Sequence, residues 1–193
     1  MNRLTNLFFS FKSVAIALVL LLGQSAIAQD EAQSTSITAD KIEWISFEEA
    51  FEKNKTHPKP WIIDIYTDWC GWCKRLDQTT FVDSIIVDEI RTHFYAVKLD
   101  GEQKADIVLG EETYSFVESG RRGYHELPAA LMNGNLSYPT IVFLSDKLQN
   151  LQPVQGYKSA KDFHPIVSFF AVFDAENPIK WEDFMSTYQS PYN

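Results

Sequence analysis

Residues 62–75 read Ile-Ile-Asp-Ile-Tyr-Thr-Asp-Trp-Cys-Gly-Trp-Cys-Lys-Arg, and this stretch decides the fold. An apolar run with the β-branched and aromatic residues typical of a strand leads directly into a Cys-x-x-Cys pair. A segment compatible with a helix follows from Gly71. Both cysteines of the chain, Cys70 and Cys73, lie in this stretch. We therefore interpret it as a candidate thiol–disulfide site at a strand-to-helix junction.

The strand before the cysteines carries one unexpected residue. Residues 61–67 are nearly continuously apolar, which predicts a strand covered on both faces, such as a central parallel strand. Asp64 interrupts this apolar run from the inside. A buried carboxylate is costly unless it has a partner or a chemical task. Asp64 is therefore a candidate functional residue.

The first 28 residues have the pattern of a secretory signal peptide. Arg3 and Lys12 give a positive start, residues 14–22 are apolar without a break, and Ala-Ile-Ala at 26–28 has the small-x-small form of a cleavage site. The apolar run is shorter than the ~20 residues that a membrane span needs. We expect a cut near Ala28, a periplasmic or secreted protein, and no stable membrane anchor.

Composition excludes several classes of protein. The chain of 193 residues has a formal net charge of −9, and an acidic chain has no electrostatic reason to bind nucleic acid or anionic lipid. Two cysteines are too few for a disulfide scaffold, so in an exported protein the pair is either oxidised and inert or redox-active. We expect a flexible polar leader over 29–43 and a single domain over 44–193.

Hydrophobic periodicity predicts alternating helices and strands. Helices are expected over 46–55, 71–81, 84–92, 124–132, 159–170 and 181–188, and strands over 61–67, 94–99, 141–144 and 154–157. In the middle of the chain, residues 107–109 and 114–117 are interpreted as a hairpin. The alternation of helix and strand indicates an α/β layer structure.

Residues 69–74, which read Trp-Cys-Gly-Trp-Cys-Lys after a strand, resemble the active site of the thioredoxin superfamily. The likeness is strongest to secreted or periplasmic bacterial thioredoxin-like proteins with a Cys-Gly-Trp-Cys motif. Asp64 falls where thioredoxins keep a buried aspartate, and Lys98 falls where they keep its lysine partner. Tyr138-Pro139 matches their cis-proline turn. Gly156 matches the glycine on the strand that follows that turn, so the order agrees from about residue 44 to residue 173.

This resemblance implies a thioredoxin-like α/β fold with a central mixed β-sheet flanked by helices. An insertion of about residues 101–135 precedes the cis-proline strand. The resemblance also implies that Cys70 is the nucleophile and Cys73 the resolving thiol. In the same way it implies that Asp64 accepts a proton and that Lys98 tunes Asp64. No cofactor is expected beyond the redox-active disulfide between the two cysteines, and no metal.

The resemblance further implies a substrate surface around the sulfur atoms. Its expected residues are Trp69, Gly71, Trp72, Tyr138, Pro139 and Gly156. The expected partners are protein thiols and disulfides, together with a membrane electron donor or acceptor. His125 with Arg121 and Arg122 forms either a further substrate contact or a solvated helix start.

Several alternatives remain open. Trp72 stands where reducing thioredoxins commonly have proline, so a disulfide-donating oxidant is the alternative to a protein disulfide reductase. A non-catalytic thioredoxin-fold binding module is a further alternative. A purely structural disulfide closing so small a loop would stabilise the chain by only about 2 kcal/mol. A metal site would need more soft ligands, and covalent haem attachment would need a histidine where Lys74 stands.

Overall fold

The computed structural model of the chain describes residues 41–192. The expected signal peptide over 1–28 and most of the expected leader over 29–43 lie outside these residues. Within the described part, Ile42 is buried in the core. The packed domain therefore begins before the expected boundary at residue 44.

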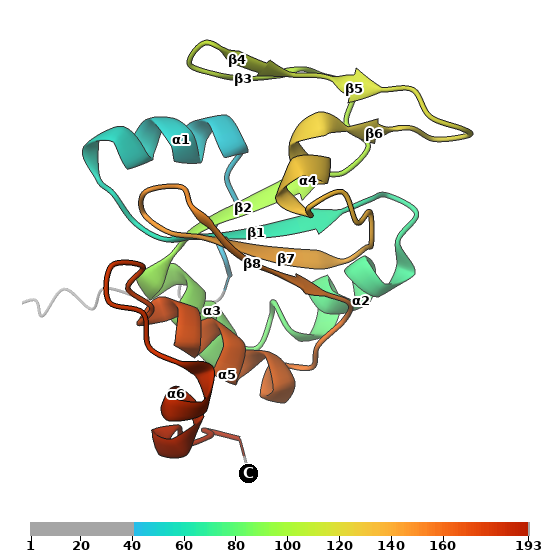
Figure 1. Cartoon of the computed structure of the whole chain (residues 1–193). Coiled ribbons are helices and arrows are strands. Elements are labelled where there is room, and N and C mark those ends of the chain that lie inside the picture. The colour runs from blue at the N-terminus through green and yellow to red at the C-terminus, as the bar shows by residue number, and fades with distance from the viewer. Residues whose placement is uncertain (1–40, 193) are drawn as a thin grey trace, which may run out of the picture. The chain divides into compact units, whose positions relative to one another are not determined.

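A four-stranded mixed sheet with the strand order β2-β1-β7-β8 forms the centre of the domain (Figure 1). Its strands are β1 (Trp61–Tyr66), β2 (Tyr95–Asp100), β7 (Thr140–Leu144) and β8 (Asn150–Gln155). β1 pairs in parallel with β2 and antiparallel with β7, and β7 pairs antiparallel with β8. The prediction of a central, doubly covered strand at 61–67 is confirmed, since β1 is buried along almost its whole length.

Helices cover both faces of this sheet (Figure 1). They are α1 (Phe47–Thr56), α2 (Gly71–Thr79), α3 (Ser84–His93), α4 (Glu126–Leu131), α5 (Ala160–Ala171) and α6 (Trp181–Thr187). α1 and α4 lie over one face, and α3 and α5 lie over the other. Side-chain caps set several of the starts: Ser46 accepts a hydrogen bond from the Glu49 N–H, and Asp83 and Ser159 cap α3 and α5 in the same way.

Side chains of the central strand alternate between two apolar clusters. Ile62 packs into the cluster that contains Leu76 of α2, whereas Ile63 packs into the cluster on the other face. Because the side chains of a strand alternate with a period of two, Asp64 shares the face of Ile62. Lys98 of β2 is the register partner of Asp64. The sheet therefore places this carboxylate and this ammonium side by side on the face that α2 covers.

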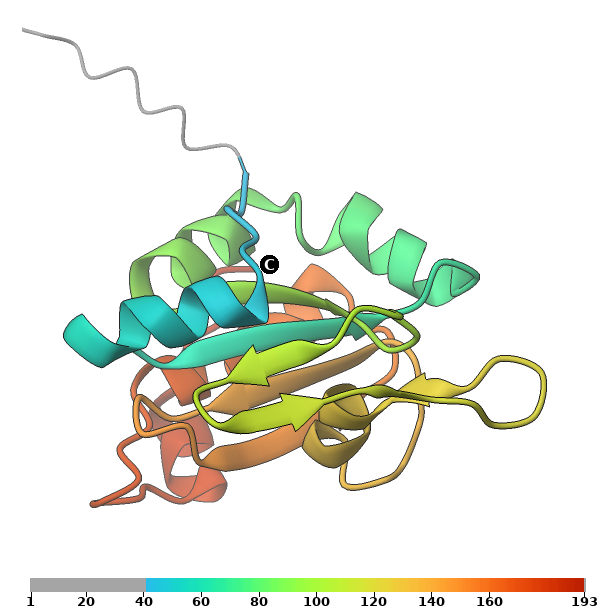
Figure 2. The same ribbon diagram turned by 90° about the horizontal axis from the view of Figure 1, so that it is seen from above.

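The insertion consists of two short hairpins followed by α4 (Figure 2). β3 (Ile107–Leu109) pairs with β4 (Glu112–Tyr114), and β5 (Phe116–Val117) pairs with β6 (Tyr124–His125). The expected hairpin of 107–109 with 114–117 is therefore correct for its first strand only.

Ser115 explains why the expected hairpin is broken. Its N–H donates to the Glu126 carboxylate at 2.8 Å, and its carbonyl accepts the Glu126 N–H at 3.0 Å. The chain leaves β4 at this residue and finds a new partner in β6. As a result, the helix expected over 124–132 begins only at Glu126.

The strand after the proline turn also differs from its prediction. β8 begins and ends earlier than the expected 154–157, so Gly156 follows the strand instead of lying in it. Its φ of +79° is in the left-handed region that glycine adopts without strain. The Gly156 N–H donates to the Pro139 carbonyl at 2.8 Å, which ties the two turns together.

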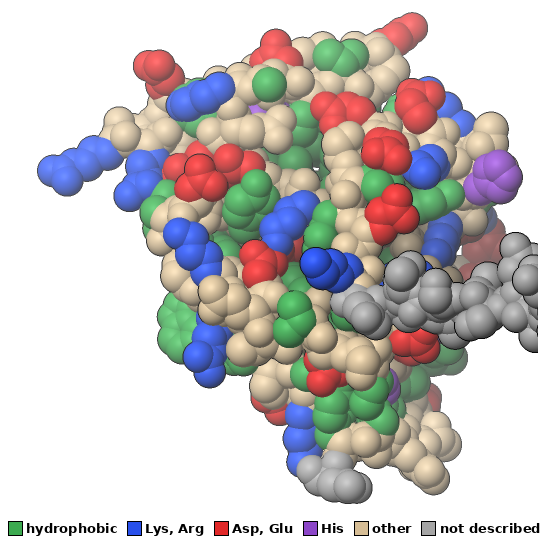
Figure 3. Space-filling view, turned by 180° about the vertical axis from the view of Figure 1, so that it is seen from behind, with side chains coloured by type: hydrophobic (Ala, Val, Ile, Leu, Met, Phe, Trp, Pro, Cys, Tyr) green, Lys and Arg blue, Asp and Glu red, His purple; other side chains and the backbone are tan. Residues whose placement is uncertain are grey.

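Charged side chains of both signs are interspersed on the face drawn in Figure 3, without a continuous basic patch there. The expectation that the chain does not bind nucleic acid stays a prediction.

Candidate active site

The two cysteines form a disulfide at the first turn of α2. Their Cα atoms are 5.3 Å apart, and both residues are buried. Cys70 occupies the N-cap position, where its Sγ accepts the backbone N–H of Cys73 at 3.0 Å. The Cys70 N–H in turn donates to the Thr67 carbonyl at 3.0 Å. The turn between β1 and α2 thus fixes Cys70 at the helix start.

This position has a direct chemical consequence for Cys70. The first N–H groups of a helix have no partner within the helix, and the helix dipole favours negative charge at that end. In the reduced protein, the N–H that contacts Cys70 Sγ would therefore stabilise a thiolate at this residue. Cys73 lies one turn further along the same helix, within bonding distance of Cys70.

Asp64 is completely buried on the central strand. The Nζ of Lys98 is 3.1 Å from Asp64 Oδ2, and within residues 41–192 no other donor reaches this carboxylate. Burial raises the pKa of Asp64 to about 6; the Lys98 charge and hydrogen bond oppose the rise, and the Asp77 charge adds to it. The pair that the resemblance implied is therefore present in the structure.

Lys98 has a second carboxylate partner that sequence reasoning missed. Its ammonium also forms an ion pair with Asp77 on α2, which is partly exposed. Burial lowers the pKa of Lys98, but the Asp64 and Asp77 carboxylates outweigh burial, and the pKa lies above its ordinary value. The sequence spacing could have identified Asp77 as a residue near the site. It follows Cys73 by four residues and therefore lies on the same face of the helix.

Two exposed tryptophans flank the disulfide, as the sequence predicted for this surface. Trp69 is 49% exposed and Trp72 is 61% exposed. The Trp72 ring lies against the Tyr157 ring, with centroids 5.5 Å apart. A mostly apolar hollow of about 610 Å³ opens beside this pair, lined by Gly71, Trp72, Arg75 and Tyr157. Gly71, between the two cysteines, therefore lies at the edge of this hollow.

The Tyr138–Pro139 peptide bond is cis, which confirms that prediction. Pro139 is buried and Tyr138 is half-buried, and the Tyr138 ring packs edge-to-face against Trp69, with ring centroids 5.9 Å apart. The fold thus brings the proline turn next to the residue that precedes Cys70, although the two segments lie far apart in the sequence.

His125 does not line a groove. It is completely buried at the end of β6, where its Nδ1 accepts the N–H of Leu127 at 3.3 Å. The interpretation of His125 as a substrate contact or a solvated helix start is therefore wrong. Arg122, in contrast, reaches the active site: its guanidinium carbon lies 4.5 Å from the Trp69 ring centroid. Across the described residues, no group of three or more His, Cys, Asp or Glu side chains is placed to hold a metal ion.

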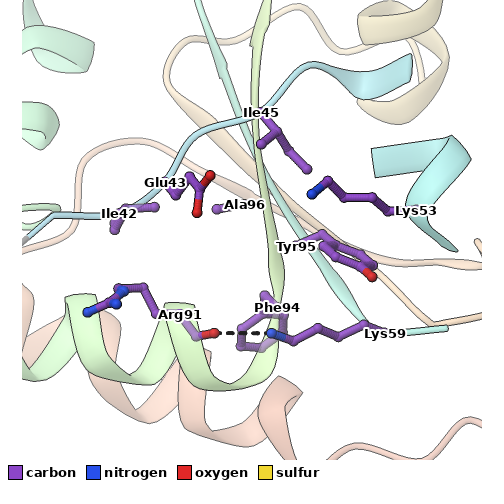
Figure 4. Close-up of a pocket in the computed structure, with 9 residues that line it drawn as sticks. All are labelled: Ile42, Glu43, Ile45, Lys53, Lys59, Arg91, Phe94, Tyr95 and Ala96. Carbon is purple, nitrogen blue, oxygen red and sulfur yellow. Dashed lines mark hydrogen bonds between the residues drawn. The ribbon is translucent and has the colours of Figure 1, made fainter. Parts of the chain in front are cut away.

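A second hollow, of about 280 Å³, lies at the start of β2 (Figure 4). Lys53 and Lys59 line it, and the Lys59 ammonium donates to the Arg91 carbonyl at 3.1 Å. Partial burial lowers the pKa of Lys59. None of the predicted site residues lines this hollow, so it is separate from the disulfide site.

Comparison with known proteins agrees with the fold and with the cysteine site. A family model of thioredoxin-like DsbH proteins, described as "Protein of unknown function, DUF255", matches residues 29–175. The disulfide bond reductase DsbH of Chlamydia pneumoniae is 31% identical over 81 residues, which are 41% of this chain and 48% of that protein. The uncharacterized protein B0495.5 of Caenorhabditis elegans is 26% identical over 84 residues, 43% of this chain and 12% of that protein. The chain thus spans about half or less of the length of these curated relatives.

Solved structures show the same fold. A candidate disulphide-isomerase from Bacteroides thetaiotaomicron superposes with a TM-score of 0.50 at 25% identity, covering 70% of this chain and 98% of that one. A thioredoxin from Thermus thermophilus superposes with a TM-score of 0.50 at 14% identity, covering 68% of this chain and 88% of that one. The predicted thioredoxin-like α/β fold is confirmed. Because the family match covers well over half of its residues, this chain belongs to the thioredoxin-like DsbH family.

Proposed function

We propose that this chain is a periplasmic thiol–disulfide oxidoreductase that reduces protein disulfides through Cys70 and Cys73. The observation that carries the proposal is the disulfide at the first turn of α2, with the Cys73 N–H directed at Cys70 Sγ. A cysteine pair with one sulfur at a helix start can alternate between a dithiol and a disulfide.

The first step consumes the substrate disulfide. The Cys70 thiolate attacks one substrate sulfur, a mixed disulfide forms, the substrate S–S bond breaks, and the other substrate sulfur leaves as a thiolate. The N–H groups at the start of α2 favour the thiolate form of Cys70, which is the attacking species.

The second step releases the reduced substrate. Cys73 loses its proton and attacks Cys70 Sγ, which restores the Cys70–Cys73 disulfide and frees the second substrate thiolate. Two electrons have then passed from the dithiol to the substrate. We assign Asp64 as the acceptor of the Cys73 proton and Lys98 as the residue that tunes Asp64. A pKa of about 6 leaves Asp64 largely ionised at neutral pH and therefore able to accept a proton.

The reductive direction requires a donor that returns two electrons to the Cys70–Cys73 disulfide. We propose a membrane protein dithiol for this role. Two observations support reduction over oxidation: the buried Asp64–Lys98 pair resembles that of reducing thioredoxins, and the DsbH relative from Chlamydia pneumoniae is named a disulfide bond reductase.

The periplasmic location rests on the amino-terminal sequence. We propose a signal peptide over 1–28, a leader after it, and a thioredoxin-like domain that extends to residue 193. The family match begins at residue 29, immediately after the proposed cleavage site, which supports this division. Along residues 41–192 the structure has no helix with the length and apolar character needed to cross a bilayer.

We also propose that an extended polypeptide binds across the surface next to Cys70. Its contacts would be Trp69, Gly71, Trp72, Tyr138, Pro139 and Gly156. The edge-to-face contact of Trp69 with Tyr138 and the hydrogen bond from Gly156 to Pro139 support a single continuous surface.

Reduction of insulin with dithiothreitol as the electron source tests the activity. The wild-type protein should accelerate the reaction, and Cys70→Ser should not. Equal rates for the two proteins would favour the binding module over the enzyme. Equilibration of the purified domain with thiol buffers then tests the direction: a reduction potential near ~−270 mV supports a reductant, and one near ~−120 mV supports a disulfide donor.

A further inference from the structure

Three segments hold the Trp69 side chain in place. Its Nε1–H donates to Glu102 Oε1 at 3.0 Å, the Arg122 guanidinium lies over its ring, and the ring packs edge-to-face with that of Tyr138. Arg122 Nη1 is also 3.9 Å from Glu102 Oε2. Glu102 and Arg122 both belong to the insertion. An indole that is half exposed to water therefore has its orientation set by residues 33 and more positions away in the sequence.

The opposite side of the disulfide is less restrained. Within the described residues, Trp72 has a ring contact with Tyr157 and lies on an open hollow, and it is more exposed than Trp69. The two indoles that flank the cysteines thus differ: Trp69 is held by a hydrogen bond, a cation and a ring, whereas Trp72 packs against one ring and is more exposed. Fixing a large exposed side chain costs conformational entropy, so its partners must offset that cost.

The insertion is itself anchored to the central strand close to Trp69. The Gly101 N–H donates to the Tyr66 carbonyl at 2.8 Å, and the Gly101 carbonyl accepts the His125 N–H at 2.8 Å. The Glu102 N–H donates to Asp100 Oδ1 at 2.9 Å. These bonds connect the end of β1, the end of β2 and β6, so Glu102 has a fixed position relative to Trp69.

We propose that Glu102 and Arg122 are positioning residues that hold Trp69 as a rigid platform for polypeptide disulfides, which makes the insertion one wall of the substrate-binding surface. This inference rests on the proposed function and deepens it. The residues on either side of a reacting cysteine in an extended polypeptide advance by about 3.3 Å each. They therefore reach past Cys70 onto the adjacent indole, whereas a small disulfide contacts little beyond the sulfur atoms.

A platform of this kind acts on binding and not on sulfur chemistry. An aromatic side chain that is already fixed loses less entropy when a polypeptide binds, so the affinity of the complex is higher. The thiolate of Cys70 depends instead on the helix start, which neither Glu102 nor Arg122 contacts in the structure. Removal of either side chain should raise the half-saturating concentration of a polypeptide and leave the saturating rate unchanged.

The experiment uses single turnovers of the fully reduced full-length mature protein. Insulin serves as the polypeptide disulfide and glutathione disulfide as the small one. The variants are Glu102→Ala and Arg122→Ala, and the matched controls are Glu118→Ala and Arg121→Ala, which remove exposed residues of the same type within the insertion. Glu102→Gln keeps a carbonyl acceptor for the Trp69 N–H and should recover part of the loss.

We expect the half-saturating insulin concentration to rise about two- to fivefold in Arg122→Ala, because a cation–π contact is lost. In Glu102→Ala we expect a rise of about five- to tenfold, because a hydrogen bond that is half exposed to solvent is lost. Saturating rates and all rates with glutathione disulfide should stay within about twofold of the controls. Unchanged half-saturation for insulin, or an equal loss with both substrates, would overturn the inference.

Failure of the proposed function has a separate signature. It appears as equal rates for wild type and Cys70→Ser with glutathione disulfide. In that event the inference is decided by binding of fluorescein-labelled reduced insulin B chain to the Cys70→Ser/Cys73→Ser protein, followed by fluorescence anisotropy. Weaker binding after Glu102→Ala than after Glu118→Ala would support the platform, and equal binding would overturn it.

Discussion

Lys98 on β2 and Asp64 on β1 are register partners in a parallel pair of strands, and Lys98 Nζ lies 3.1 Å from Asp64 Oδ2. The register places both Cα atoms side by side, and the period of the strands places both side chains on the face covered by α2. The ammonium only partly offsets the cost of burying the carboxylate, since the pKa of Asp64 still rises to about 6.

Replacement of Asp64 by asparagine should stabilise the oxidised protein at neutral pH. The pKa of Asp64 is about 6 in the folded protein, against about 3.9 in an unfolded chain. Between these values the folded state binds more protons than the unfolded state, so the stability of wild type falls as the pH rises from about 4 to about 6. Above about pH 6 this decrease in the free energy of unfolding is nearly complete and amounts to about 3 kcal/mol.

Urea denaturation at pH 4 and pH 7.5 measures this effect. Asp64→Asn should exceed wild type by up to about 3 kcal/mol at pH 7.5 and differ little at pH 4. Asp88→Asn, which changes an exposed aspartate on α3, is the control. A stability difference that is the same at both pH values would show that titration of Asp64 is not its source.

The same substitution should slow thiol–disulfide exchange. If Asp64 accepts the Cys73 proton as proposed, loss of its carboxylate makes resolution of the mixed disulfide slower. We expect a decrease of about tenfold or more at pH 7. Reduction of insulin by the reduced protein across pH 6–9 measures the rate. An unchanged rate throughout this range would remove Asp64 from the proposed mechanism.

Asp77→Asn should shift the pH dependence of the reaction to lower pH. Asp77 raises the pKa of Asp64 through its negative charge, and it shares the Lys98 ammonium with Asp64. Its neutralisation therefore lowers the pKa of Asp64, and the carboxylate form becomes available in more acidic solution. The acid limb of the rate profile should move down in pH, whereas Asp88→Asn should leave it in place. Infrared titration of the Asp64 carboxyl group gives an independent measurement; an unchanged midpoint would contradict the prediction.

The residues that sequence reasoning placed correctly belong to long, regular elements. Cys70 and Cys73 follow an apolar run that predicts a strand covered on both faces. Asp64 is conspicuous in that run because a buried carboxylate needs a partner. Lys98 could be paired with it through the resemblance to thioredoxins, and the parallel register of β1 with β2 places the two residues side by side.

The insertion could not be read in the same way, because its strands contain only two or three residues. Segments of this length have no measurable periodicity, and tertiary contacts decide their partners. Ser115 shows this directly, since its two hydrogen bonds to Glu126 end one hairpin and begin the next. Arg122 approaches Trp69 only because β5 pairs with β6, so no local pattern could identify it as an active-site residue.

Gly123→Ala should destabilise the hairpin that carries Arg122. Gly123 has a φ of +77°, which costs an L-residue roughly 1–2 kcal/mol. In addition, a Cβ at this position would collide with the Val117 carbonyl and the Phe116 ring. Gly120 in the same loop has a φ of +58°, but a Cβ added there would meet no atom within 4 Å. Gly120→Ala therefore measures only the free-energy cost of a positive φ, without a collision.

Hydrogen exchange of the β5 and β6 amides and urea denaturation separate the two variants. We expect Gly123→Ala to lose protection across β5 and β6 and to be less stable than Gly120→Ala by at least about 1 kcal/mol, since a collision with backbone cannot be relieved by a side-chain rotation. Equal protection in the two variants would mean that the hairpin adjusts to the added methyl group. If the insertion also positions Trp69, Gly123→Ala should raise the half-saturating insulin concentration in the same direction as Arg122→Ala, because the displaced loop carries the guanidinium away from the indole.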